Sequence, residues 1–533
     1  MWEKINNSSL LFSKSFIQNK SNHSLYSNRV FFNRIYFYYV NKGYYRIIIN
    51  SVVNLLVSNF LVFFILFLFN CIDYGGLLAL NSEQNLSDYI DINNILNLNV
   101  FFTILLVVFF ALDFIKIISL LDDMYIFSNI KKFYNNNLKI RDSELEYLEW
   151  KEILDIYVES TNLELNPYFI DSIITTKDNY FIALLDNKII RPYHLNSIFE
   201  WNLMYCIIYS FVDSSEKISP LVFKNPNQIE SSMKNRLRVI SILSVIFMPL
   251  IMVLITFYNL FNYGEQFYNK PNLFISKNFT RIAKLRFRNY NELTHLFEER
   301  METLTEITKR YNDTFKNKVL EAILKLVVFV FSSVFVTLII LTIINDHILT
   351  NLNIVGGKNV LWFIGIFGSI IAILRSVINS KSKENPVNIM EEIAELTIVD
   401  DKVIENASMN VIKNKFLENY RFKILQIFYD ILWTMIMPIQ LWSISYDTRY
   451  VVSFIKKISI NNTKIGITCV FSDFTSEEFN EDEAEHNYFG SLLDDIERIE
   501  FNKKKSHSKD RLLKYYPNCL DNIVSQSTQI NII

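Results

Sequence analysis

The hydrophobic residues of this chain occur in long blocks separated by polar stretches, rather than in the spaced stripes of a soluble helical protein. Six blocks are long enough to enter a membrane, because an α-helix rises about 1.5 Å per residue and the hydrocarbon core is about 30 Å thick. In the first block, nothing charged occurs between Arg46 and Asp73. We place the six blocks at residues 47–72, 98–121, 238–264, 324–345, 358–376 and 424–445.

The charges between the blocks predict the side of the membrane that each loop occupies. Lys and Arg close to membrane segments stay on the cytoplasmic side. No Lys or Arg occurs between Asp73 and Asp113 or in the link 346–357, whereas residues 265–320 hold eleven. The two cation-free links are therefore expected to be lumenal, and residues 265–320 are expected to be cytoplasmic.

Two blocks contain a proline, Pro249 in 238–264 and Pro438 in 424–445. Proline removes a helix hydrogen bond and clashes with the preceding turn. If block 238–264 spanned the membrane, the charge signals of the loops after it would be inverted. We therefore expect both blocks to enter from the cytoplasm and return, bent at their prolines, while four blocks span and both termini are cytoplasmic. Six spans with proline-kinked helices are the alternative.

The segments between the blocks predict further local structure. Ser143 and Glu146 have the spacing of a capping box before an apolar stripe, which predicts an amphipathic helix. A second helix is expected within residues 290–315. Apolar and polar residues alternate on both sides of the polar turn at 461–464, which predicts a short β-hairpin.

These patterns together predict an all-α polytopic membrane protein, with four transmembrane helices plus two re-entrant helices per protomer, cytoplasmic helical regions and a small β-hairpin. The expected organisation is a disordered cytoplasmic N-terminus (1–29), a first transmembrane hairpin (30–122), a cytoplasmic helical region (123–237), re-entrant helix 1 (238–264), a cytoplasmic helical region (265–320), a second transmembrane hairpin (321–378), cytoplasmic helices (379–423), re-entrant helix 2 (424–445), a β-hairpin that ends the core (446–474) and an acidic, mostly disordered tail (475–533).

Composition excludes several classes of function. Half of the 533 residues are hydrophobic and the net charge is -2, which argues against a general nucleic-acid binder. The four cysteines and six histidines are scattered, without the spacing of a disulfide framework or a metal site. Nucleophile-elbow, zinc-protease and phosphate-loop motifs do not occur in the sequence. We therefore expect no enzyme activity, no metal and no cofactor.

Ionisable residues next to the membrane blocks are the remaining unusual feature. Such groups are costly at membrane depth, so each is a functional hypothesis. The sharpest is Asp430, an intramembrane acid whose short side chain cannot reach far toward the interface. The others are Asp113, Lys116, Glu265, Lys270 and Arg375, for which a side chain extended to the membrane surface is the alternative interpretation.

Two smaller signals concern assembly and modification. Gly365, Gly368 and Ala372 put small residues on one side of block 358–376, which lets another helix approach closely. That helix belongs either to the same protomer or to another subunit. Asn85 begins an Asn-Leu-Ser glycosylation sequon in a loop assigned to the lumen.

Several stretches of the chain resemble the autophagy-related protein 9 family, in matching order and spacing. They include "SELEYLEWKEI" (143–153), "DNYFIALLDNKII" (178–190), "FRNYNELTHLFEERM" (287–301) and "FGSIIAILRSVI" (367–378), together with 31–74 and 451–474. The resemblance covers nearly all of residues 30–474. It implies a domain-swapped homotrimer that moves phospholipids between leaflets without ATP during autophagosome formation.

The resemblance also implies partners and a location. A bridge-like lipid-transfer protein of the autophagy-related protein 2 family and the autophagy initiation complex are the expected partners, besides phospholipids and the membrane itself. The expected locations are Golgi- and endosome-derived vesicles, the preautophagosomal structure and the phagophore membrane. A scaffold or vesicle seed that recruits autophagy factors without transporting lipid is the alternative, and a gated ion channel is a more remote one.

The family's lipid path suggests candidate residues in this chain. The family has a Lys-Arg-Glu triplet before a proline after the first re-entrant helix, whereas here Tyr268, Asn269 and Lys270 precede Pro271, so one charge is kept. Arg375 falls on the family's arginine in "RSVI", and Ala372 replaces a threonine. The residues expected along the lipid path are Asn262, Tyr263, Glu265, Asn269, Lys270 and Arg375.

Overall fold

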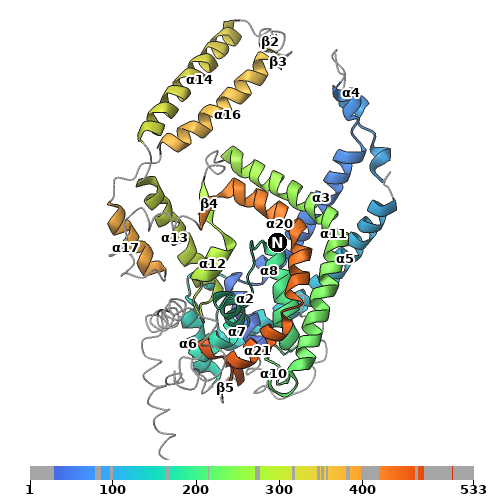
Figure 1. The fold of residues 1–533 in the computed structure, drawn as a ribbon, viewed down its shortest axis with the longest axis vertical. Helices are drawn as coiled ribbons and strands as arrows, with labels where there is room; N and C mark the ends of the chain where they lie inside the picture. Colours follow the sequence, from blue (N-terminus) through green and yellow to red (C-terminus); the bar gives the residue numbers. More distant parts are fainter. Residues whose placement is uncertain are drawn as a thin grey trace, which may run out of the picture. The chain divides into compact units, whose positions relative to one another are not determined.

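The computed structural model describes residues 29–78, 86–96, 100–161, 167–213, 215–269, 276–314, 318–344, 349, 353–355, 358–379, 385–397, 419–462, 466–472 and 507 (Figure 1). The chain divides into two compact units. Unit 1 comprises residues up to Tyr258, Arg288–His295 and the residues from Leu432 onward, and unit 2 comprises Asn259–Phe287 and Leu296–Ile431.

Long apolar helices account for all six hydrophobic blocks. Four helical segments in the described parts of the chain are long and apolar enough to cross a membrane, at Tyr44–Asn70, Pro226–Gly264, Glu321–Ile344 and Lys423–Ile444. Between 6% and 22% of their apolar windows is buried within the chain. Such exposed apolar faces are stable only against lipid or another apolar surface. The other two blocks, 98–121 and 358–376, lie in α5 (Val100–Phe133) and in the shorter α16 (Val360–Asn379).

Two of the described helices have a proline in their interior, α11 (Pro226–Asn269) and α20 (Lys423–Ile444), and each continues through it, past Pro249 or Pro438. Helix α11 begins at Pro226, well before the predicted block 238–264, and its first turns are polar. Length and composition do not distinguish a span from a re-entrant helix. The re-entrant topology therefore stays a prediction.

The core of unit 1 is built around α7 (Pro167–Asp186), a helix buried on nearly all sides. Helix α2 (Arg29–Val40) and α6 (Trp150–Thr161) pack near it, with the Tyr36 and Trp150 rings 5.1 Å apart. The Trp150 indole Nε1–H donates to Asp171 Oδ1 on α7 at 2.9 Å. The buried Trp150 indole N–H and Asp171 carboxylate are thereby paired with one another, as is usual for polar groups in a protein core.

Residues 288–295 are held on α7 by polar contacts, although they follow unit 2 in sequence. Arg288 Nη2 lies 2.6 Å from Asp178 Oδ2. The buried Asn291 has a positive φ of 57°, a conformation that asparagine tolerates better than most residues. Its backbone N–H donates to Asn179 Oδ1 at 2.9 Å.

His295 provides a pH-dependent contribution to the stability of unit 1. Its Nδ1 lies 2.9 Å from the Tyr36 hydroxyl. Burial, followed by the positive charge of Lys42, lowers the pKa of His295 from 6.5 to about 4. The unfolded chain therefore binds this proton as pH falls through 6.5, whereas the folded chain binds it only near pH 4, so folding stability decreases between these two values.

We expect the melting temperature of the protein to fall as pH is lowered from 7 to 5, and to fall less in a His295→Gln variant. Scanning fluorimetry of both proteins in one detergent measures the difference between the two slopes. The carboxylates that titrate in this range are common to both proteins and cancel in the comparison. Parallel slopes would contradict the assignment of this proton to His295.

Unit 2 contains a helical hairpin and a small core. Helix α14 (Lys318–Ile344) packs along α16, and the strands β2 (Asn353–Val355) and β3 (Lys358–Asn359) pair between them (Figure 1). The core is formed by α12 (Arg281–Phe287), α13 (Thr294–Thr314), α17 (Pro386–Leu396) and strands β1 (Lys277–Phe279) and β4 (Tyr420–Phe422).

The remaining described elements are short, apart from α3. They are α3 (Tyr44–Asn70), α4 (Tyr74–Leu78), η2 (Leu86–Tyr89), η3 (Ile92–Leu96), η4 (Tyr134–Leu138), η5 (Glu144–Glu146), α8 (Ser197–Leu203), η6 (Met204–Ile208), α9 (Tyr209–Phe211), α10 (Leu221–Lys224), α21 (Thr448–Ile458), β5 (Ser459–Asn462), β6 (Gly466–Cys469) and η8 (Val470–Ser472).

Two local predictions are corrected by the structure. The capping box is wrong, because Ser143 makes no side-chain cap and only the short η5 follows it, with α6 beginning at Trp150. Within η5, the Leu145 carbonyl accepts from Lys42 Nζ at 2.7 Å. The β-hairpin is confirmed as the antiparallel pair β5 and β6, but most of residues 446–458 form α21 instead.

Candidate functional site

Polar side chains gather on one face of the last turns of α11, within unit 2. Asn259, Asn262, Tyr263 and Gln266 recur at helical spacing, so they lie along one side of the helix. Gln266 Nε2 donates to Asn262 Oδ1 at 3.2 Å. The apolar part of α11 is therefore followed by a row of hydrogen-bonding groups.

Lys423, the first residue of α20, joins this row. Its Nζ donates to Gln266 Oε1 at 3.3 Å and lies 4.8 Å from the centroid of the Tyr263 ring. An ammonium over an aromatic face is attracted by the negative potential of the ring. The cluster of Asn262, Tyr263, Gln266 and Lys423 is the candidate site.

The small sheet of β1 and β4 holds Lys423 in place. The strands pair antiparallel, with Lys277 opposite Phe422, and the Lys423 backbone N–H donates to the Ser276 carbonyl at 2.9 Å. Gln426 Nε2 donates to the Asn278 carbonyl at 2.6 Å, one turn into the helix. The base of α20 is therefore fixed to β1 by both backbone and side-chain bonds.

The first turns of α20 continue the polar surface toward the apolar part of the helix. Lys423, Gln426 and Asp430 recur at spacings of three and four residues, so they share one face. Asp430 is partly buried there. Charged and amide groups therefore form a stripe along one face of the first turns of α20.

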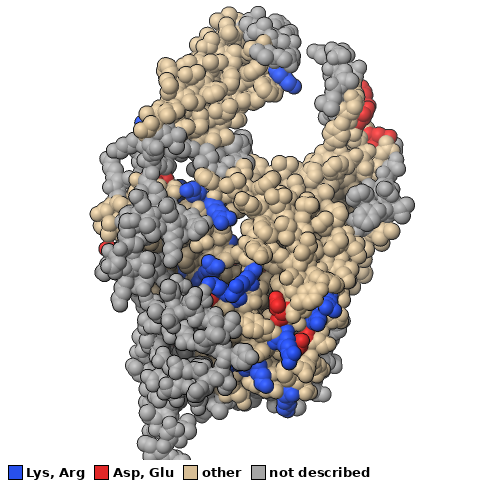
Figure 2. All heavy atoms as spheres, in the orientation of Figure 1, with Lys and Arg blue, Asp and Glu red and all other residues tan. Residues whose placement is uncertain are grey.

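The surroundings of the site are basic. Figure 2 shows Lys and Arg side chains gathered over α12 and β4. These elements and β1 contain Lys277, Arg281, Lys284, Arg286 and Arg421, and Lys423 follows β4 as the first residue of α20. Burial, followed by the charge of Arg281, lowers the pKa of Lys284. A concentration of cations of this kind attracts anions such as phosphate.

The structure brings together only part of the predicted lipid path. Asn262 and Tyr263 belong to the cluster, whereas Arg375 is exposed on a different helix, α16. Glu265 and Asn269 lie in the last turns of α11, and their side chains are outside the described part. Lys270 lies wholly outside the described residues, as does Asn85 of the sequon.

Sequence reasoning missed Lys423 and Gln266. For Lys423, the sequence offered one signal: the residue directly precedes block 424–445, so it is a cation at the border of an apolar run. Gln266 carried no signal of its own, because an isolated glutamine after an apolar block is common at helix ends. Their contact joins residues 157 positions apart and is visible only in the folded chain.

Helix packing explains one of the small residues in α16. A Cβ placed on Gly368 would lie 3.3 Å from Phe335 Cε2 of α14, so the glycine lets these helices approach within one chain. Among the described atoms, a Cβ on Gly365 would meet nothing within 4 Å. Gly368 therefore serves helix contact within this chain, whereas no described atom accounts for a glycine at position 365.

Two further polar contacts lie on the membrane helices of unit 1. On α5, the buried Asp113 accepts from Asn59 Nδ2 of α3 at 2.6 Å, and Lys116 Nζ is 3.6 Å from its other oxygen. Near the second proline, Ser241 Oγ of α11 donates to the Pro438 carbonyl at 2.7 Å. Each contact ties two apolar helices together, because a buried acceptor needs a donor.

The described residues offer no metal chemistry. No group of three or more His, Cys, Asp or Glu side chains in this part of the chain is placed to hold an ion.

Comparison with known proteins gives one consistent result. A family model described as "Autophagy protein ATG9" matches residues 25–475. The chain is similar to autophagy-related protein 9 of Dictyostelium discoideum, with 27% identity over 87% of this chain and 68% of that protein. The corresponding protein of Kluyveromyces lactis is 25% identical over 91% of this chain, which spans only 56% of that protein's length. The cryo-EM structure of Schizosaccharomyces pombe Atg9 has the same fold, with a TM-score of 0.63 at 23% identity, over 84% of this chain and 98% of that one.

Proposed function

Because the chain belongs to the autophagy protein ATG9 family, we propose that it acts in autophagosome formation by moving phospholipids between membrane leaflets without ATP. The observation that carries this proposal is the Lys423 cluster, in which a cation and several amides lie where two apolar helices meet. The site combines groups that bind a polar headgroup with apolar surfaces that suit acyl chains.

The physical need for such a site comes from the cost of moving a headgroup through hydrocarbon. An unpaired polar group there costs several kcal/mol, and an unpaired charge costs more. Lys423 offers a charged partner to a phosphate, and Asn262 and Gln266 offer amide donors. The stripe through Gln426 and Asp430 extends these contacts along α20. A headgroup that follows this stripe keeps hydrogen-bond partners during transfer and meets a lower barrier.

The topology and assembly belong to the same proposal. Helices α11 and α20 enter the membrane from the cytoplasm and return, so their polar ends lie on the side from which headgroups enter. Polar backbone at membrane depth has to be shielded by protein or water, and a homotrimer supplies such a surface. Asn262, Tyr263, Glu265, Asn269, Lys270 and Arg375 line the lipid path, and Lys423 and Gln266 are added to it.

The partners and locations named from the family complete the proposal. The protein receives lipid from a bridge-like lipid-transfer protein of the autophagy-related protein 2 family and contacts the autophagy initiation complex. It resides in Golgi- and endosome-derived vesicles and at the phagophore membrane. When lipid is delivered to one leaflet only, redistribution between the leaflets allows both leaflets of the membrane to expand.

Reconstitution tests the activity directly. Liposomes with a fluorescent phospholipid in both leaflets are prepared with and without the protein, and an impermeant quencher is added in the absence of ATP. We expect quenching to exceed half of the signal only with protein, and Lys270→Leu and Arg375→Leu to slow it. Unchanged rates would remove those two residues from the path.

The same liposomes distinguish the alternative functions. Ion flux measured with an entrapped dye, without lipid exchange, would indicate a channel. Neither flux in protein that is correctly inserted and keeps its wild-type melting temperature would indicate a scaffold or vesicle seed. Either result would overturn the proposed transport.

A further inference from the structure

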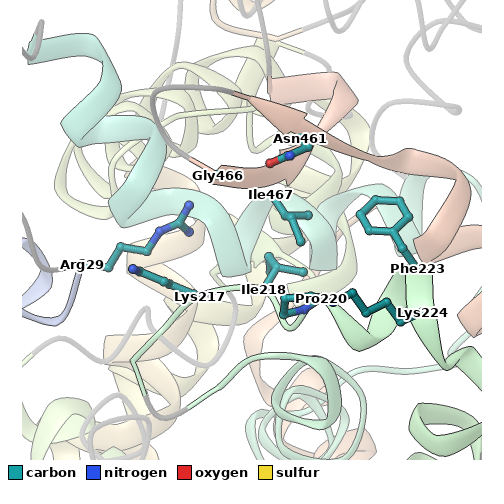
Figure 3. Close-up of a pocket in the computed structure, with 9 residues that line it drawn as sticks. All are labelled: Arg29, Lys217, Ile218, Pro220, Phe223, Lys224, Asn461, Gly466 and Ile467. Carbon is teal, nitrogen blue, oxygen red and sulfur yellow. The ribbon is translucent and has the colours of Figure 1, made fainter.

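A pocket of about 360 Å³ lies in unit 1, between the segment that leads into α10 and the β5–β6 hairpin (Figure 3). Sites for small molecules in proteins have volumes of about 300–1,000 Å³. Arg29, Lys217 and Lys224 supply three cations to the wall of the pocket, and none of its nine described lining residues is acidic. The pocket therefore has the size and the charge for a small anionic ligand.

The cationic and apolar groups of the pocket are separated from one another. Figure 3 shows the ends of Arg29 and Lys217 side by side at one end of the pocket and the Phe223 ring at the other end. The side chains of Ile218 and Ile467 lie between them. The Phe223 side chain keeps 38% of its surface exposed, so its ring is accessible to a ligand. A ligand that fits both ends carries an anionic group and a flat apolar group.

Arg29 is held in position from two sides. Only 3% of its surface is exposed, and its Nη1 lies 3.4 Å from Thr176 Oγ1 of α7. On the other side, a Cβ placed on Gly466 of the hairpin would lie 3.9 Å from Arg29 Nη2. Gly466 has a φ of 86°, which glycine adopts readily. The guanidinium is therefore preorganised, and a ligand that binds it does not have to order a flexible side chain.

The backbone at Lys217 is fixed by a tight turn. Val212 and Ile218 form an antiparallel bridge, and the Asp213 backbone N–H donates to the Lys217 carbonyl at 2.8 Å. The Lys217 side chain itself is exposed at the pocket. This lysine can therefore adjust to a ligand while the wall that carries it stays in place.

The nearest acid in sequence does not neutralise this group of cations. Glu216 accepts from Lys177 Nζ at 2.8 Å and from the Asn33 side-chain amide. The charge of Glu216 also acts on Arg29 and Arg34, so one carboxylate is shared among three cations. Burial has the largest effect on Arg29 and lowers its pKa despite this carboxylate. An anion next to the guanidinium would therefore stabilise its charge.

The distance of the pocket from the membrane part of α11 indicates the source of its ligand. Lys224 ends α10, α11 begins at Pro226, and the uncharged run of α11 begins at Val239. The helix rises about 20 Å between Pro226 and Val239. The headgroup layer on each side of a bilayer is only about 5–8 Å thick. Along α11 the pocket lies beyond the headgroups, so its ligand comes from the aqueous side.

We propose that this pocket binds a soluble organic phosphate that carries an aromatic ring system, with a nucleoside diphosphate as the representative ligand. The phosphates lie at Arg29 and Lys217, where both partners of each hydrogen bond are charged. The ring system packs on Phe223, and the amide of Asn461 on the pocket wall offers hydrogen bonds to the sugar hydroxyls. This binding does not depend on the proposed lipid transport, which needs no nucleotide.

The test measures binding of a fluorescent nucleotide to the full-length protein in detergent. N-methylanthraniloyl-ADP is titrated at low salt without divalent cations, and its anisotropy is recorded. We expect saturable binding that unlabelled ADP reverses. Adenosine, which lacks the phosphates, and inorganic phosphate, which lacks the ring system, are each expected to compete about tenfold less well or worse.

Matched substitutions identify the site. Lys217→Gln is expected to weaken binding about tenfold, because a charge-assisted hydrogen bond to phosphate is lost. Lys132→Gln removes an exposed cation elsewhere in unit 1 and is expected to have no effect. Phe223→Ala is expected to weaken binding about tenfold through loss of stacking. Tyr147→Ala, at a ring that is 86% exposed, is its control.

Thermal unfolding provides a second measurement. A ligand that binds only the folded protein raises the melting temperature, and at a hundredfold excess over its dissociation constant the rise is about 5 °C or more. We expect ADP to produce this rise in the wild-type protein and a smaller rise in Lys217→Gln at the same concentration. The melting temperatures without ligand show whether each variant is folded.

Three outcomes would overturn the proposal. The first is competition by inorganic phosphate as strong as that by ADP, which would identify a simple anion site. The second is an equal response of binding to Lys217→Gln and Lys132→Gln. The third is stronger competition by dioctanoyl phosphatidylinositol 4-phosphate than by ADP, which would identify a site for a lipid headgroup instead.

Discussion

Replacement of Lys423 by leucine is expected to slow lipid exchange in the liposome assay about tenfold, which corresponds to about 1.4 kcal/mol in the barrier. The ammonium group contacts Gln266 and the Tyr263 ring, so it lies among the groups that would receive a headgroup phosphate. A hydrogen bond to a charged group contributes about 1.5–3 kcal/mol. Leucine keeps the apolar stem and removes that contribution.

Two controls separate charge from structure in this experiment. Lys423→Arg keeps the positive charge and is expected to retain most of the rate. Lys309→Leu removes an exposed cation from α13 and is expected to leave the rate unchanged. A wild-type rate in Lys423→Leu would remove the cluster from the lipid path, even if the protein itself transports lipid.

The largest loss of stability is expected for Asn291→Ala, at about 3 kcal/mol, because several buried partners lose their hydrogen bonds. Asn291 Nδ2 donates to the Ser472 carbonyl at 2.7 Å and to the Tyr168 hydroxyl at 3.2 Å. Its Oδ1 accepts from Asn179 Nδ2 at 2.8 Å. Alanine also tolerates the positive φ at this position less well.

Thermal unfolding in detergent measures this effect. A loss of this size corresponds to a melting temperature lower by about 5–10 °C in a unit of this size. Asn135→Ala, at an exposed asparagine of η4, is the matched control and is expected to change the melting temperature little. A shift in Asn291→Ala no larger than in the control would show that this network does not hold residues 288–295 on α7.

The two proposals fail independently. Loss of lipid exchange in Lys423→Leu concerns unit 2, whereas nucleotide binding concerns a pocket of unit 1. A protein that scrambles lipid but does not bind the nucleotide would keep the first proposal and lose the second. A protein that binds the nucleotide but does not scramble lipid would lose the first proposal and keep the second, and would be a scaffold with a nucleotide site.

Local patterns were sufficient for the apolar helices and the hairpin. A run such as residues 47–72 is recognised from the sequence because it is long, uncharged and predominantly apolar, and a helix in lipid needs no contact with another part of the chain to satisfy this pattern. Strands β5 and β6 were predicted from alternation around a polar turn. The capping box failed because the helix begins only at Trp150, where Glu152 Oε2 accepts from the Glu149 backbone N–H instead.

The sequence by itself determined that this is a helical membrane protein of the ATG9 family, since long apolar blocks and a family-wide order of motifs are both written along the chain. Only the tertiary structure decided that Lys423 meets Tyr263 and Gln266, that residues 288–295 pack on α7, and that a cationic pocket lies beside β6. The physical reason is that the hydrophobicity of a side chain is a property of that residue alone and can be read from the sequence. A polar contact between distant residues exists only when the fold brings the two groups within hydrogen-bond distance.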